Sequence, residues 1–309
     1  MAGSGRVLLT GASGQVGGEI ARLLAGSSGF SYEVIAPSRA ELDLSDEAAV
    51  RAMVREVRPQ WIVNPAAYTA VDKAESEPDL AYAINRDAVR AMGEEAKALG
   101  AAVIHFSTDY VFDGEGDRAY REDDATEPTS VYGASKLAGE VELARSGAAH
   151  VILRTSWVYD ATGGAAKKNF LLTILKLARE RETLRVVGDQ HGAPTWSRDL
   201  ARLTGHVMGF AEASGGSVAD AVARVGGVYH AGGAGETTWF GFAAEGVRLL
   251  GEKEPGVKLA KIEAITTEEY PTPAKRPKNS RLDCAKLEAT FGWTMMRWED
   301  SLRAVVEEL

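Results

Sequence analysis

Short apolar stretches alternate with longer segments of helical periodicity along most of the chain. The apolar stretches predict β-strands at Arg6–Thr10, Tyr32–Ala36, Trp61–Asn64, Ala101–Ser107, His150–Thr155 and Leu184–Val187. The segments between them predict helices at Gln15–Ala25, Asp46–Val57, Leu80–Leu99, Ser130–Arg145 and Asn169–Glu182. Strands that alternate with helices in this way form a parallel sheet with helices on both faces. The pattern therefore predicts an α/β fold with a doubly wound, Rossmann-type parallel sheet, and we expect seven strands in it.

The pattern becomes less regular after Asp189. Glycine, proline and serine are more frequent there, two further helices are predicted at Arg198–Met208 and Trp239–Leu250, and three prolines interrupt Glu268–Ser280. We therefore expect a smaller C-terminal substrate-binding lobe beside a dinucleotide-binding core. The core is expected to contain residues 1–160, with its sheet completed by about 182–190 and 226–231. The lobe is expected to contain about 161–181, 191–225 and 232–309.

Composition narrows the classes of partner. The chain has 309 residues, of which 45% are hydrophobic and 26% charged, and its formal net charge is −9. A net negative charge argues against nucleic-acid binding, whereas the local basic groups at 167–168 and 275–281 leave an anionic small molecule open. No apolar run approaches the roughly 18 residues that a membrane span needs. The single cysteine, Cys284, and an N-terminus without a signal-peptide pattern predict a cytoplasmic protein.

A glycine-rich turn lies between the first predicted strand and the first predicted helix. Gly11, Gly14 and Gly17 give the spacing Gly-x-x-Gly-x-x-Gly. Glycines at this place permit a tight turn and let a pyrophosphate approach the backbone at a helix N-terminus. The loop therefore predicts a dinucleotide cofactor, bound by Gly11, Ser13, Gly14, Gln15, Val16 and Gly17.

The end of the second strand bears on the choice between NADPH and NADH. An acidic residue there holds the ribose hydroxyls of NAD, whereas an arginine accommodates the 2′-phosphate of NADP. This strand is followed by Ser38 and Arg39, which favours NADPH. Glu41 and Asp43 follow closely, so NADH stays open as an alternative.

Two side chains at the start of the helix near 130–145 suggest proton chemistry. Tyr132 and Lys136 are four residues apart and so lie on the same helix face. A nearby ammonium is expected to lower the pKa of the phenol from about 10, which would make Tyr132 a proton donor to a carbonyl oxygen. Thr108 follows a central strand at the edge where such sheets bind ligands, and its hydroxyl is expected to assist.

These motifs resemble the extended short-chain dehydrogenase/reductases, and within them the dTDP-4-dehydrorhamnose reductase family. The resemblance covers nearly the whole chain. It rests on 10–17, 64–75, 107–114, 132–140, 154–159, 189–195 and 276–283.

The resemblance implies reduction of the C4 ketone of a dTDP-linked 4-keto-6-deoxyhexose, with dTDP-4-dehydro-L-rhamnose converted to dTDP-L-rhamnose. It makes Thr108, Tyr132 and Lys136 the catalytic residues. It adds cofactor contacts at Asp43, Leu44, Ala66, Ala67 and Tyr68, besides Tyr132 and Lys136. It implies substrate contacts at Thr69, Val71, Thr108, Asp109, Tyr110, Trp157, Asn169, Arg276, Asn279 and Ser280.

Several alternatives remain. One is a reductase of another nucleotide-linked keto-deoxysugar, with a different product stereochemistry or base. Another is a non-catalytic regulatory homologue, like the β subunit of methionine adenosyltransferase. Some family members are dimers joined by a metal that acidic residues hold; Gln15 occupies the glycine loop here and no carboxylate cluster is recognisable, so we expect no metal. We expect a monomer or a homodimer.

Overall fold

The main sheet of the protein has six parallel strands. The structure is a computed structural model, and it describes residues 5–26, 32–164 and 168–309. The strand order is β10–β5–β4–β3–β1–β2. From β1 the chain adds β2 on one side and then β3, β4, β5 and β10 on the other, so the order reverses between β1 and β3, as in a doubly wound fold. The strands are β1 Gly5–Leu9, β2 Tyr32–Ile35, β3 Trp61–Asn64, β4 Ala102–Thr108, β5 Ala149–Thr155 and β10 Gly227–His230.

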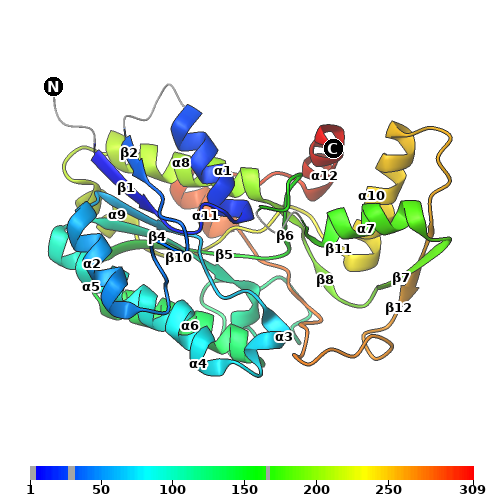
Figure 1. Ribbon diagram of the computed structural model, residues 1–309, viewed down its shortest axis with the longest axis horizontal. Helices are drawn as coiled ribbons and strands as arrows, with labels where there is room; N and C mark the ends of the chain where they lie inside the picture. Colours follow the sequence, from blue (N-terminus) through cyan, green and yellow to red (C-terminus); the bar gives the residue numbers. More distant parts are fainter. Residues whose placement is uncertain (1–4, 27–31, 165–167) are drawn as a thin grey trace.

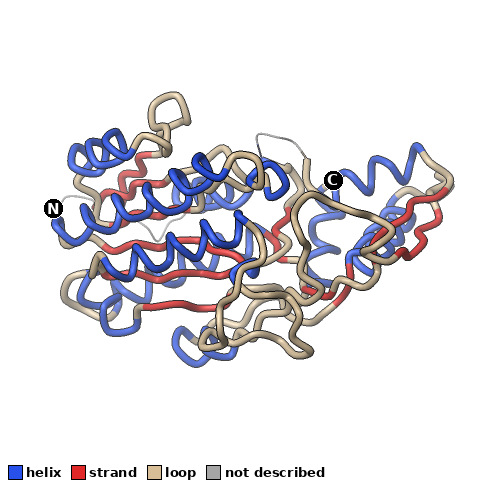
Figure 2. The backbone as a smooth tube through the Cα atoms, turned by 90° about the horizontal axis from the view of Figure 1, so that it is seen from below, coloured by secondary structure: helices blue, strands red, loops and turns tan. Residues whose placement is uncertain are grey.

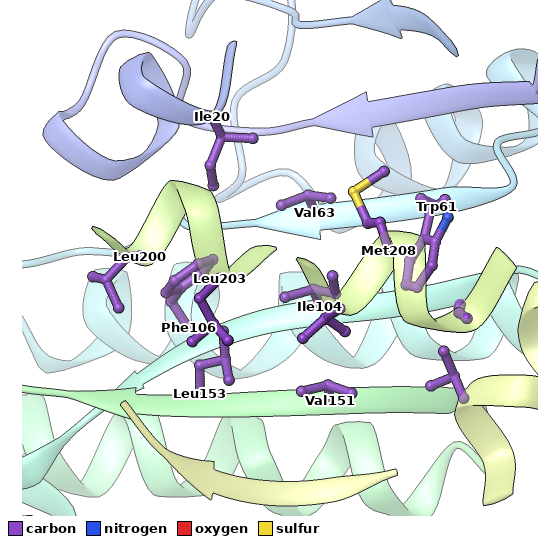
Figure 3. Close-up of a cluster of buried hydrophobic side chains, with 14 of the residues drawn as sticks. Ile20, Trp61, Val63, Ile104, Phe106, Val151, Leu153, Leu200, Leu203 and Met208 are labelled. Atoms are coloured by element: carbon purple, nitrogen blue, oxygen red, sulfur yellow. The ribbon is translucent and has the colours of Figure 1, made fainter. Parts of the chain in front are cut away.

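Helices cover both faces of this sheet (Figure 1). One face carries α1 Gln15–Gly26, α8 Ser197–Ala213, α9 Val218–Val225 and α11 Ala285–Phe291. The other carries α2 Glu47–Val57, α5 Ala88–Leu99 and α6 Val131–Arg145. Every residue of β3 and β4 is buried, because both of their faces are covered. Figure 3 shows the first of these cores, where Ile20 and Met208 point from α1 and α8 toward Val63, Ile104 and Val151 of the strands.

A second, smaller lobe lies at one end of the sheet (Figures 1 and 2). It has its own apolar core, formed by α7 Phe170–Glu180, α10 Trp239–Lys253 and α12 Trp298–Glu308 with β7 Thr183–Val187 and β12 Lys261–Ile265. Two short strand pairs lie where the lobe meets the main sheet. They are β6 Val158–Tyr159 with β9 Thr195–Trp196, and β8 His191–Gly192 with β11 Thr237–Thr238.

The expectation of seven strands in the main sheet is wrong. The segment near Leu184–Val187 pairs with β12 in a separate two-stranded sheet instead of completing the core. The reason is visible in β7 itself, where Leu184 and Val186 are buried while Thr183 and Arg185 are exposed. A strand with one polar face cannot lie inside a sheet that helices cover on both sides.

The structure also differs from the expected division of the chain. Residues 191–225 were assigned to the lobe, but α8 and α9 pack on the main sheet. The reason is their apolar faces, with Leu200, Leu203 and Val222 buried against the strands. Residues 1–4 and 27–31 of the expected core and 165–167 of the expected lobe lie outside the described residues.

The predicted helix Leu80–Leu99 is interrupted. It consists of α4 Pro78–Tyr82, a π-helical turn at Ala83–Asp87 and α5. Two further short elements lie nearby at the carboxyl edge of the sheet, α3 Val71–Ala74 and a 3₁₀ turn at Asp109–Val111. Both the π-turn and the 3₁₀ turn contribute side chains to the site described next.

Candidate active site

The glycine loop forms a tight turn between β1 and α1. Gly11 has a φ of +63°, in the left-handed region that favours glycine, and the Gly14 N–H donates to the Gly11 carbonyl over 2.9 Å. A Cβ on Gly17 would lie 2.1 Å from that same carbonyl oxygen. The predicted loop residues therefore form a close-approach turn at a helix N-terminus, with Ser13 and Gly14 exposed and Val16 packed against the core.

Gln15 joins this loop to the lobe. Its Nε2 donates to the Val158 carbonyl over 3.3 Å, and its Oε1 accepts from Asn169 Nδ2 over 2.8 Å. Asn169 also caps α7, because its Oδ1 accepts from the Leu172 N–H. The structure thus brings Gln15, predicted to bind cofactor, together with Asn169, predicted to bind substrate.

The segment after β2 is exposed and polar. Ser38, Arg39 and Asp43 are exposed, and Leu44 is partly buried. The Glu41 carboxylate is turned back on the Ser38 N–H over 2.7 Å, and this hydrogen bond holds the pKa of Glu41 below its usual value. Glu41 is therefore engaged within its own turn, while Arg39 is exposed at the place that the sequence predicts for a 2′-phosphate contact.

The loop after β3 lies against the glycine loop. A Cβ on Gly11 would lie 3.0 Å from Ala66. The backbone of Tyr68 is fixed by Asn85 of the π-turn. The Asn85 amide oxygen accepts from the Tyr68 N–H over 2.9 Å, and the amide nitrogen donates to the Tyr68 carbonyl over 3.2 Å. The same amide donates to Ser135 on α6 over 2.9 Å. Sequence reasoning missed Asn85; the polar residue buried within a helical segment was the available signal.

Thr108 connects Tyr132 to Asp109. The Thr108 hydroxyl donates to Asp109 Oδ1 over 3.0 Å and also hydrogen-bonds the Tyr132 phenol. Tyr110 packs edge-on against the Tyr132 ring, with centroids 5.4 Å apart. Ser280, from the C-terminal segment, lies near the Asp109 carboxyl and acts to lower its pKa, while Asp109 Oδ2 has no hydrogen-bond partner among the described residues. Asp109 is 4% exposed, so it lies behind Thr108 and supports it.

The electrostatics of Tyr132 differ from the expectation. Burial raises the pKa of the Tyr132 phenol above its ordinary value of 10, and the hydrogen bond to Thr108 opposes that rise. The sequence predicted the opposite direction, on the assumption that the Lys136 ammonium would lie at the phenol. The ammonium instead donates to the Phe106 carbonyl over 2.6 Å and lies 3.3 Å from His105 Nε2. Burial lowers the pKa of Lys136 to about 8.

Trp157 lies at the junction of core and lobe. Its backbone has a φ of +48°, a left-handed conformation that is strained for a bulky residue. Its ring stacks on Trp239 of α10, with centroids 3.8 Å apart.

Two more predicted substrate contacts lie around the start of α3. Thr69 is exposed, and Val71 is partly buried.

The basic residues of the C-terminal segment are tied to the core. Arg276 donates to Asp72 of α3 over 2.6 Å and approaches the Tyr110 hydroxyl over 3.5 Å. The Asn279 amide donates to the Arg118 carbonyl over 2.6 Å and accepts from Arg281 over 2.8 Å. Arg276 is therefore placed beside Tyr110, whereas the Asn279 side chain joins Arg281 of its own segment to the loop that contains Arg118.

Among the residues that the structure describes, no group of three or more histidine, cysteine or acidic side chains is placed so that it could hold a metal ion. No described helix is both long enough and apolar enough to cross a bilayer.

Comparison with known proteins now gives the family. Residues 5–309 match the family described as RmlD substrate binding domain. The chain is 44% identical to the dTDP-4-dehydrorhamnose reductase of Escherichia coli (strain K12), over 98% of this chain and 97% of that protein. The chain belongs to this family.

Solved structures of dTDP-4-dehydrorhamnose reductases share the fold. The structure from Clostridium acetobutylicum superposes with a TM-score of 0.86 at 37% identity, over 98% of this chain and 99% of that one. A structure from Bacillus anthracis in complex with NADP has a TM-score of 0.85 at 32% identity, over 99% of this chain and 100% of that one. The predicted family, fold class and enzyme class, an oxidoreductase of the dTDP-4-dehydrorhamnose reductase family, are confirmed.

Proposed function

We propose that the protein catalyses the NADPH-dependent reduction of the C4 ketone of dTDP-4-dehydro-L-rhamnose to dTDP-L-rhamnose. The observation that carries the proposal is the full-length 44% identity to a reductase of that name. The geometry agrees with it, because the Thr108–Tyr132 hydrogen bond lies at the carboxyl edge of β4, where open α/β sheets bind ligands. A reductase of a related nucleotide-linked sugar is the second candidate.

NADPH fits the glycine loop and the segment after β2. The close approach at Gly11 and Gly17 leaves room for a pyrophosphate at the α1 N-terminus, and Arg39 is exposed for a 2′-phosphate. NADPH supplies the hydride when bound, and NADH is the alternative donor. We propose contacts from the loop residues, Ser38, Arg39, Asp43, Leu44, Ala66, Ala67 and Tyr68.

The chain's own residues handle the proton and the substrate. Tyr132 donates its proton to the C4 oxygen as the hydride reaches C4, and the high pKa of the buried phenol keeps that proton in place beforehand. Thr108 orients the phenol. The Lys136 ammonium, one helical turn away, stabilises the negative charge left on Tyr132. The sugar is enclosed by Thr69, Val71, Tyr110, Trp157 and Asn169, and Arg276 and Ser280 lie on the side of the nucleotide.

We propose that the protein acts in the cytoplasm, as a monomer or a homodimer. Its single cysteine, Cys284, is half-buried, and burial raises the pKa of the thiol to about 12, so little of the reactive thiolate is present near neutral pH. The lobe containing α7, α10 and α12 would contribute the nucleotide-sugar side of the site, and the six-stranded core the cofactor side.

Replacing Tyr132 with Phe tests the proposal directly. We expect Tyr132→Phe to lower kcat about a thousandfold or more, because the proton donor is lost, while the Kd for NADPH stays within roughly threefold. Turnover is followed by NADPH consumption with dTDP-4-dehydrorhamnose, and the product is identified by NMR. Tyr229→Phe is the matched control, since that hydroxyl bonds the Val225 carbonyl away from the site.

Three outcomes separate the candidates. Unchanged turnover in Tyr132→Phe contradicts the assigned role. A product with the other C4 configuration favours the related reductase. NADPH binding by the wild-type protein without any consumption favours a non-catalytic homologue.

A further inference from the structure

Behind Lys136 lies a row of buried polar side chains that the proposed chemistry does not use. Thr10 follows β1 and is 3% exposed. Asn64 ends β3 and is 1% exposed, and His105 lies within β4 and is 0% exposed. Asn64 and His105 are register partners on adjacent strands. Three polar groups in one row across adjacent buried strands need a reason, because each costs free energy to bury.

The row is hydrogen-bonded from end to end. The Thr10 hydroxyl donates to Asn64 Oδ1 over 2.5 Å, Asn64 Nδ2 lies 3.1 Å from His105 Nδ1, and Lys136 Nζ lies 3.3 Å from His105 Nε2. Lys136 also donates to the carbonyl of Phe106, the residue after His105, over 2.6 Å. The chain therefore links the residue that precedes the glycine loop to the ammonium of the site.

The histidine can serve Lys136 in either of two protonation states. Burial lowers the pKa of His105 well below 6.5, with the charge of Lys136 as the next cause, so the ring is neutral and has one donor and one acceptor nitrogen. An ammonium needs Nε2 as an acceptor, whereas a neutral amine needs Nε2–H as a donor. As placed, Asn64 Nδ2 donates to Nδ1, so Nε2 carries the proton and suits the amine. A change of tautomer makes Nε2 an acceptor for the ammonium when the Asn64 amide turns over with it, so that its Oδ1 accepts from Nδ1–H and the Thr10 hydroxyl accepts from its Nδ2.

We propose that His105 is a positioning residue that fixes the amino group of Lys136 and partners it in both its charged and its neutral form. The expected effect on turnover rests on the proposed function, whereas the expected effect on the titration of Lys136 does not. Other charged or titratable groups that face the pair are Glu140 on α6, Arg154, which pairs with Glu140 over 2.7 Å, and His150 on β5. Among the described residues, the hydrogen-bond partners of Lys136 Nζ are His105 Nε2 and the Phe106 carbonyl, and none of these three side chains is one of them.

The sign of the expected change follows from burial. In His105→Leu the amino group keeps the Phe106 carbonyl but loses its nitrogen partner, and the remaining apolar surroundings penalise the ammonium more than the amine. Lys136 should therefore titrate about one pH unit or more below its wild-type value. ¹⁵N NMR of lysine-labelled protein without substrate measures this directly, with the signal assigned by its absence in Lys136→Met.

Matched variants separate positioning from packing. His105→Gln places an amide near the Nε2 position and should restore the titration to within about half a pH unit. His105→Asn keeps a polar group beside Asn64 but is too short to reach Lys136, so it should resemble His105→Leu and serves if the leucine variant does not fold. His206→Leu, a histidine on α8 that bonds the Phe291 carbonyl, should leave Lys136 unchanged.

Turnover supplies the second measurement. We expect His105→Leu and His105→Asn to lower kcat about tenfold or more with the NADPH Kd within roughly threefold, and the alkaline limb of kcat to move down with the Lys136 titration. An unchanged Lys136 titration in both variants, or a glutamine variant as defective as asparagine, overturns the proposal. If the wild-type protein shows no turnover, the proposed function fails, while the NMR titration still tests the role of His105.

Discussion

At the residue scale, Asp109 is the side chain of this site whose burial most clearly destabilises the folded protein. Its carboxylate is almost fully enclosed, with Oδ1 accepting from Thr108 and Oδ2 without a hydrogen-bond partner among the described residues. Burial raises the pKa of Asp109 from 3.8 to about 6. A carboxyl group with a raised pKa favours the folded state at acid pH, and that contribution is lost as the pH rises through about 6.

Replacing Asp109 with Asn removes this titration while retaining an oxygen that accepts from Thr108. Relative to wild type, we expect Asp109→Asn to gain about 1 kcal/mol in free energy of unfolding between pH 5 and pH 8, because only the wild-type residue ionises in the folded state over that range. Urea unfolding at the two pH values measures it.

Asp113→Asn is the control for that measurement. The hydrogen bond from Tyr120 holds the pKa of Asp113 below 3.8, so its carboxyl is ionised at both pH values and its difference from wild type should stay flat. An equally flat difference for Asp109→Asn would show that Asp109 is ionised in the folded protein at pH 5.

Among the elements, the turn from β1 into α1 leaves the least freedom for substitution. Its helix begins with Gln15, and the first turn packs so closely on Gly11 that Gly17 has no room for a side chain. The contact is with a backbone carbonyl, which cannot move aside as a flexible side chain could. The shape of the cofactor loop therefore depends on one missing methyl group.

Gly17→Ala should lower NADPH affinity by about tenfold or more, since the turn must open to admit the Cβ. Gly26→Ala, at the other end of the same helix, is the control, because a Cβ there meets no atom within 4 Å. Fluorescence titration with NADPH gives both values, and circular dichroism confirms that the variants are folded. Wild-type affinity in Gly17→Ala would mean that the pyrophosphate does not use this turn.

Elements buried on both faces could be predicted from the sequence, and elements that depend on distant partners could not. The strands at Trp61–Asn64 and Ala102–Thr108 are short, mostly apolar segments, so their location follows from local pattern. The location of β7 depends on β12, nearly eighty residues later, whose sequence KIEAI carries charges that hide a strand. Local pattern holds no information on that pairing.

The same distinction applies within the site. Tyr132 and Lys136 are one helical turn apart, so spacing alone indicated the pair. His105 and Asn64 meet only through the register of β3 with β4, and Asn85 reaches Tyr68 only because a π-turn interrupts its helix. Spacing also failed to give the direction of the Tyr132 pKa, since burial, a property of the whole fold, raises it and the Lys136 ammonium bonds the Phe106 carbonyl instead of lying at the phenol.

At the scale of the whole molecule, the substrate proposed for this acidic protein is itself an anion. The net charge is −9, so the basic residues near the site act against an overall repulsion. Arg276 approaches the Tyr110 hydroxyl over 3.5 Å, and it pairs with Asp72. The ion pair holds the C-terminal segment on α3 and also competes with any phosphate for the guanidinium.

Opposite effects are expected from the two halves of this ion pair. Arg276→Gln should weaken the binding of dTDP by about tenfold, whereas Asp72→Asn should strengthen it by roughly threefold, because the guanidinium loses its internal partner. Calorimetric titration with dTDP measures both. Arg248→Gln, which breaks an exposed pair on α10, is the control. Weaker binding in Asp72→Asn would show that the carboxylate orients Arg276 instead of competing for it.

The discontinuity of the small lobe restricts how such proteins can be recombined. Its core is assembled from three separate stretches of chain, around α7–β7, α10–β12 and α12, and each stretch is followed or preceded by residues of the main sheet or its helices. A chimera that exchanges this lobe between two relatives must therefore splice the gene at several junctions at once. A single crossover point would build the lobe from helices and strands of two different proteins, and the apolar side chains of its core would not match in shape. Substrate range in this architecture is accordingly more accessible to point substitution than to exchange of whole segments.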